Sequence, residues 1–138
     1  MERRIVFNRH AFRHLPSPRM LTREEHDLIE FMLQQHTEVP ERAELLEQLD
    51  HLAVSVECTT CPTIIFAGIE PDFRTSPNNA MLRALDAYDK AAAAFEPNGI
   101  NLILYIVDWK LAELELYRTG SEAIERLPSI ESLIVPTG

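Results

Sequence analysis

The spacing of apolar residues predicts two amphipathic helices in the first third of the chain. Thr22 and Glu25 have the spacing of a capping box, in which each side chain bonds the backbone N–H of the other residue, so a helix is expected over 23–36. Pro40 stands at a favoured first-turn position for a second helix over 40–50. The apolar stripes of the two helices are Leu28, Ile29, Met32 and Leu33, followed by Leu45, Leu46 and Leu49.

The pattern then changes to alternation, which predicts strands. Apolar and polar residues alternate over 52–58, as in a half-buried strand, and the β-branched and aromatic residues of 63–67 predict a second strand. The segments 100–107 and 111–117 predict a hairpin that closes through a short turn at Asp108-Trp109-Lys110.

Between these strands, Ser76-Pro77 has the form of a helix cap followed by a first-turn proline. A helix is therefore expected from this point, with apolar positions at Leu82, Leu85, Tyr88, Ala92 and Phe95. Helices followed by a strand meander indicate an α+β fold, with N-terminal helices packed on one face of an antiparallel β-meander of about four strands. The 138 residues suit one domain, interpreted as a basic N-terminal arm over 1–20 and a single α+β domain over 21–138.

The two faces of the predicted hairpin differ in character. If Asp108 and Trp109 form a two-residue turn, Tyr105 pairs with Ala112. The face expected to pack under the helices then carries Ile103, Tyr105, Val107, Ala112, Leu114 and Leu116. The opposite face combines aliphatics with acids, as a binding face does, and carries Leu102, Leu104, Ile106, Glu113, Glu115 and Tyr117. Alternatively, the C-terminal segment covers these aliphatics through Leu127, Ile130 and Leu133.

Trp109 is expected to be an anchor, because a bulky indole is unfavourable in the centre of a tight hairpin turn. Either packing of the indole against the helices or its insertion into a partner would compensate for this unfavourable position, and both interpretations stay open.

Charge is distributed unevenly along the chain. Residues 1–23 contain six arginines and Glu2, a net charge of +5, whereas residues 24–138 have a net charge of −14. The acidic body disfavours nucleic acid and anionic membrane and favours a basic partner. The basic arm is expected to fold onto this body or to be partly mobile, with a phosphate-binding tail as the alternative. The acids of the predicted helices are interpreted as solvated surface, among them Glu24, Asp27, Glu41, Glu44 and Glu47.

The chain offers little that predicts catalysis. Its four glycines form neither a phosphate-binding loop nor a nucleophile elbow. His10 and His14 have a metal-ligand spacing without an adjacent carboxylate, and Cys58 and Cys61 have no second CxxC to complete a zinc site. The two cysteines are therefore expected to be reduced, metal-free structural thiols, with redox chemistry or metal binding as alternatives. No cofactor is expected. No apolar segment follows the Met1-Glu2-Arg3-Arg4 start, so we expect a cytoplasmic protein.

Several short strings resemble a known pattern. Leu49-Asp50-His51-Leu52-Ala53-Val54, Cys58 to Cys61-Pro62, Leu114-Glu115-Leu116-Tyr117 and Leu127-Pro128 resemble a family of small uncharacterised bacterial proteins with a C-x-C-G-C-P and LEVY pattern, over roughly residues 21–134. The chain departs from it by Cys-Thr-Thr-Cys in place of the denser cysteine run and by Trp109 where a turn glycine is expected. In character, the small acidic chain also resembles immunity proteins of contact-dependent growth inhibition and related toxin systems.

These observations predict a non-enzymatic immunity protein that binds a cognate bacterial toxin, expected to be a basic nuclease domain, and occludes its active site. The alternatives are a protein-binding or regulatory module with another partner, and an enzyme that uses the cysteine pair. Homo-oligomerisation stays open. The residues expected at the partner interface are Leu102, Leu104, Asp108, Trp109, Glu113, Glu115 and Tyr117.

Overall fold

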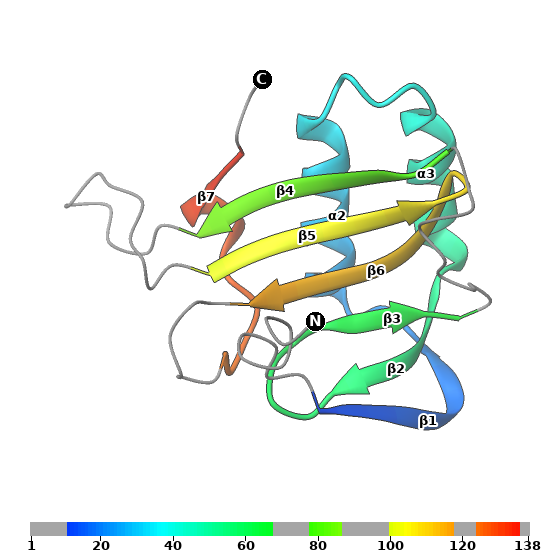
Figure 1. The fold of residues 1–138 in the computed structure, drawn as a ribbon, viewed down its shortest axis with the longest axis vertical. Coiled ribbons are helices and arrows are strands. Elements are labelled where there is room, and N and C mark those ends of the chain that lie inside the picture. The colour runs from blue at the N-terminus through cyan, green and yellow to red at the C-terminus, as the bar shows by residue number, and fades with distance from the viewer. Residues whose placement is uncertain (1–10, 68–77, 87–99, 118–123, 136–138) are drawn as a thin grey trace, which may run out of the picture.

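A computed structural model describes residues 11–67, 78–86, 100–117 and 124–135. In these residues, one antiparallel sheet of seven strands has two α-helices packed behind it (Figure 1). The strands lie in the order β1-β2-β3-β6-β5-β4-β7. The elements are β1 (Phe12–Met20), α2 (Arg23–Gln35), α3 (Arg42–Gln48), the 3₁₀ turn η1 (Leu49–His51), β2 (Ala53–Cys58), β3 (Ile64–Phe66), β4 (Ala80–Asp86), β5 (Ile100–Val107), β6 (Lys110–Tyr117), the 3₁₀ turn η2 (Ile130–Ser132) and β7 (Leu133–Ile134).

The expected fold class, helices followed by a meander of about four strands, is wrong. The structure is mostly sheet, because strands also form on both sides of the predicted set. One edge is β1, which comes from the segment expected to be a basic arm; at the other side β4 joins β5, and β7 is the edge strand. A strand added at an edge of the sheet gains ladder hydrogen bonds to its neighbour. Such pairing joins segments distant in sequence, so the local spacing of apolar residues does not predict it.

The helix expected from Pro77 is also wrong over the residues that the structure describes. Residues 80–86 form β4, which pairs with β5 on one side and β7 on the other. Leu82 and Ala84 are buried while Met81 and Arg83 are exposed, an alternation of period two. Residues 87–95 of the expected helix lie outside the described residues.

The predicted α2 is confirmed, together with its capping box. Glu25 N–H donates to Thr22 Oγ1 at 3.1 Å, and Thr22 N–H donates to Glu25 Oε1 at 2.9 Å. The buried stripe of α2 faces β4, and α3 packs over β6, so both helices cover one face of the sheet. In the described part of the chain, neither helix is long and apolar enough to cross a membrane.

A one-residue bulge in β6 sets the register of the central hairpin. Val107 pairs with Lys110 and Ile106 with Leu111, but Tyr105 then pairs with Glu113, which leaves Ala112 as an extra residue. The expected pairing of Tyr105 with Ala112 is therefore wrong. Because the side-chain period of a strand is two, the extra residue exchanges the two faces of β6 beyond it. Leu114 and Leu116 join Leu102 and Leu104 under the helices, and the glutamates lie on the other face.

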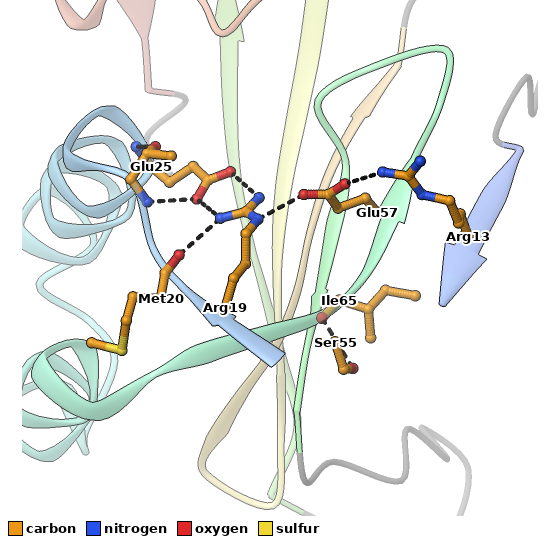
Figure 2. Close-up of polar contacts among 8 residues, drawn as sticks. Arg13, Arg19, Met20, Glu25, Ser55, Glu57 and Ile65 are labelled. Atoms are coloured by element: carbon orange, nitrogen blue, oxygen red, sulfur yellow. Dashed lines mark hydrogen bonds and ion pairs between the residues drawn. The ribbon is translucent and has the colours of Figure 1, made fainter. Parts of the chain in front are cut away.

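Arg19 connects the edge strand β1 to α2 and to β2 (Figure 2). Its guanidinium contacts both carboxylate oxygens of Glu25, at 3.0 and 2.9 Å, and Nε lies 2.6 Å from Glu57 Oε2. Arg13 contacts the other oxygen of Glu57 at 2.9 Å. The hydrogen bond from Arg19 lowers the pKa of Glu57, an effect that burial opposes and Arg13 reinforces. The basic segment is thus tied to the acidic body by ion pairs that reach across the sequence.

Deletion of Ala112 should leave the fold intact, because it removes the bulge and keeps the faces of β6. Glu113 then follows Leu111 directly, so Tyr105 stays paired with Glu113 and Leu104 with Leu114, in a regular ladder. The loss of one buried alanine should cost about 1–3 kcal/mol, measured by urea unfolding followed by circular dichroism. Insertion of an alanine directly after Ala112 should cost much more, because it moves Glu113 opposite Leu104 and places carboxylates under the helices. An insertion variant as stable as the deletion variant would contradict the argument.

Replacement of Arg19 with methionine should cost about 2–3 kcal/mol near pH 7, because it leaves the buried Glu25 carboxylate without its bidentate partner. Arg13→Met removes a mostly exposed pair and should cost at most about 1 kcal/mol. The pKa of Glu57 is lowered in the fold, so its contribution is present at neutral pH and is lost as the pH falls through that lowered pKa. The Arg19→Met penalty, measured by urea unfolding, should therefore shrink toward pH 3. Equal penalties for the two variants at neutral pH would refute this account.

Candidate functional site

The residues expected at a partner interface do not lie together. Leu102 and Leu104 are fully buried in the core beneath the helices, because their expected face was assigned in a register without the bulge. Glu113, Glu115 and Tyr117 lie on the opposite face of the sheet and are half-buried. Asp108 and Trp109 form the turn at the far end of the hairpin. The structure therefore separates the predicted interface into three places.

On the sheet face away from the helices, the two glutamates of β6 surround Tyr105. The Tyr105 hydroxyl donates to Glu115 Oε1 at 2.7 Å, and Glu113 is its partner across the ladder. Burial, then the hydrogen bond and charge of Glu115, raise the pKa of Tyr105 well above its usual range. These carboxylates therefore act first as internal partners of the β5–β6 hairpin.

The Asp108-Trp109 turn is held by neighbouring segments. Both residues have positive φ, 54° and 56°, which is the geometry of a tight two-residue hairpin turn but is unfavourable for a bulky residue such as Trp109. The side-chain amide of Gln48 in α3 donates to Trp109 O at 2.9 Å and accepts from Leu111 N–H at 3.0 Å. Trp109 N–H donates to Asn78 O at 3.0 Å, and the indole packs against the core. Two interpretations of Trp109 were open, packing within the protein and insertion into a partner. The structure shows packing within the protein.

The outer surface of the helical layer is dense in negative charge. Residues 23–50 contain nine carboxylates and two arginines, a net charge of −7 out of −9 for the whole chain. Only Glu25 among the nine is buried, in its pairing with Arg19. The others are exposed or half-exposed along α2, α3 and the segments beside them: Glu24, Asp27, Glu30, Glu38, Glu41, Glu44, Glu47 and Asp50. We call this set the acidic helical surface.

Neighbouring acids on this surface interact. The carboxylate of Glu41 raises the pKa of Glu44, through a hydrogen bond between the two side chains and through like charge. At the end of α2, His36 is buried and its Nδ1 lies 2.9 Å from Glu38 Oε2, which lowers the pKa of Glu38. The other ring nitrogen of His36 lies 3.1 Å from Arg83 O, so this residue also joins α2 to β4. Taken one by one, these acids are predicted from the sequence to be ordinary solvated surface; their density over 23–50 is the signal that identifies the surface.

The cysteine pair lies in the connection from β2 to β3. Cys58 ends β2, and its sulfur lies 3.1 Å from that of Cys61, with both thiols free. Among the described residues, one group of three side chains is close enough to bind a metal ion. It consists of His26, Asp27 and Glu30 on α2. Asp27 and Glu30 belong to the acidic helical surface, and all three residues lie on α2 and not in the cysteine loop.

Replacing Trp109 should separate backbone strain from packing. Trp109→Ala loses the indole contacts but keeps a β-carbon at positive φ, and should cost about 2–3 kcal/mol. Trp109→Gly loses the same contacts but has no left-handed penalty, so it should be about 1 kcal/mol more stable than the alanine variant. Urea unfolding of the two variants measures the difference. A glycine variant less stable than the alanine variant would show that the turn stores no strain.

Comparisons of the chain with known protein families, curated proteins and solved structures found no match in any of the three. The resemblance to the C-x-C-G-C-P and LEVY pattern thus stays a prediction.

Proposed function

We propose that the protein is an immunity protein, which binds a cognate bacterial toxin with a basic surface and blocks its active site. A nuclease domain is the toxin class that fits best, since a surface that binds phosphates must be basic. The observation that carries the proposal is the acidic helical surface, which lies within residues 23–50, a segment with a net charge of −7. Complementary fields of this kind accelerate association and favour one partner over others.

The construction of the layer supports the same function. The buried stripes of α2 and α3 pack on the sheet, and Gln48 ties the end of α3 to the hairpin turn. The carboxylates on the outer side are therefore presented by a rigid platform, which reduces the ordering cost of binding. An inhibitor of this kind needs shape and charge and no catalytic group.

The decisive experiment is rescue in cells. The proposal requires that a gene beside that of this chain encodes a large secreted protein with a basic C-terminal domain, and this domain is the toxin to be used. Cells that express this domain should survive when they also express the chain and die without it. Equal death with and without the chain would overturn the proposal. A chain that binds the domain without rescue would favour the alternative of a regulatory module.

Charge reversal should locate the binding face. Glu44→Lys with Glu47→Lys changes two exposed positions on α3 and should slow association with the toxin domain at least tenfold at low salt, with a flatter salt dependence. Glu125→Lys with Glu131→Lys changes net charge equally at exposed positions of the C-terminal segment and should have a much smaller effect. Stopped-flow association rates of the folded variants measure both. If only reversal of Glu113 and Glu115 slows binding, the interface lies on the other face of the sheet.

A further inference from the structure

The loop between β2 and β3 holds its two thiols in contact. The 3.1 Å between the sulfurs of Cys58 and Cys61 is about 1 Å longer than a disulfide bond, so a small local movement would join them. The loop itself is anchored by Thr63, which is fully buried. Thr63 Oγ1 accepts from Leu116 N–H at 2.9 Å and lies 3.2 Å from Leu116 O, which fixes the start of β3 against β6.

Hydrogen-bond donors converge on the sulfur of Cys58. Ala11 N–H lies 3.3 Å from it and Thr60 N–H 3.4 Å, while the Thr60 hydroxyl lies at 3.2 Å and the Cys61 thiol at 3.1 Å. The loop also holds Ala11 in place, because Thr59 N–H donates to Ala11 O at 2.9 Å. Two backbone N–H groups donate to this atom, and the Thr60 hydroxyl and the Cys61 thiol lie close enough to donate to it when it is ionised, so together they form a site for an anion, here the thiolate.

This environment differs from that of an inert buried thiol. Burial alone raises the pKa of a cysteine. At Cys58, burial acts in that direction, but the hydrogen bonds from Thr60, Cys61 and Ala11 outweigh it and lower the pKa to about 6. The sequence alone predicts structural thiols, because the pair lies between two predicted strands and lacks the helix N-terminus that lowers a thiol pKa in redox motifs. The donors that replace it come from the loop and from the chain just before β1, which is distant in sequence.

An open hollow of about 510 Å³ gives access to the pair. Its lining includes Cys58 and Cys61, the loop residues between them, and Ile124, Glu125 and Arg126 of the C-terminal segment. The volume is in the range of small-molecule sites. Arg126 and Glu125 supply one cation and one anion, which suits a small zwitterionic ligand such as an amino-acid-derived disulfide.

We propose that Cys58 and Cys61 form a dithiol site that exchanges with a low-molecular-weight disulfide. The Cys58 thiolate attacks one sulfur of the small disulfide, forms a mixed disulfide and releases one thiolate, which takes up a proton. The Cys61 thiol then loses its proton and attacks Cys58 Sγ, closing the Cys58–Cys61 bond and releasing the second small thiol. The protein dithiol is oxidised by two electrons and the small disulfide is reduced to two thiols.

The test uses the full reduced chain with glutathione disulfide as the probe, followed by mass spectrometry. The wild type should form an intramolecular disulfide, Cys61→Ser should accumulate a mixed disulfide on Cys58, and Cys58→Ser should react far more slowly. Near pH 6, the native protein should react about tenfold faster than the same chain unfolded in urea, since its larger thiolate fraction is only partly offset by weaker nucleophilicity.

Thr60→Val serves as the matched control for the donor set, because it removes one hydroxyl and leaves both thiols in place. It should slow the reaction near pH 6 and have little effect near pH 9, where ordinary thiols also ionise. A native rate equal to the unfolded rate would overturn the proposal. So would a wild-type mixed disulfide that Cys61 never resolves, or a Cys58→Ser variant that reacts faster than Cys61→Ser. None of these readouts depends on the toxin, so this proposal and the proposed function fail independently.

Discussion

The bulge at Ala112 controls how the sheet meets the helices. β6 is the middle strand of the order and pairs with β3 on one side and β5 on the other, so its orientation is imposed on the whole sheet. With the extra residue, Leu114 and Leu116 contribute about 1.5–3 kcal/mol each by burial, and Glu113 and Glu115 stay out of the core. A regular ladder would exchange these positions and place carboxylates against apolar side chains, which is far more costly than one bulge.

The edge strand β1 has two separate consequences for the surface. Near its end, Arg19 neutralises Glu25 and Glu57, so the basic segment offsets charge at one side of the sheet and leaves the outer side of the helices acidic. Just before its start, Ala11 N–H points at Cys58 and helps to hold a thiolate. The pairing of β1 with β2 brings both groups into position.

The two proposed sites lie at opposite ends of β6. α3 contacts the beginning of the strand through Gln48 and Leu111, whereas the cysteine loop is joined to its end through Thr63 and Leu116. A partner on the acidic helical surface and a small disulfide in the hollow would therefore bind to different parts of the molecule. The electrostatics also differ: the first site depends on the summed field of many exposed carboxylates, and the second on short hydrogen bonds to one sulfur.

The sequence by itself determined the features that depend on neighbours a few residues away. Thr22 and Glu25 specify the start of α2, alternation specifies β2, and the two-residue turn at Asp108-Trp109 follows from the spacing of the hairpin strands. That residues 80–86 form the strand β4 was decided only by the tertiary structure. Their apolar residues fit the period of a helix as well as that of a strand, and the ladders with β5 and β7 select the strand. The bulge at Ala112, the ion pairs of Arg19 and the donors around Cys58 likewise depend on contacts between segments distant in sequence. Local periodicity records which side chains a segment could bury, but the partner strand decides which of them it does bury.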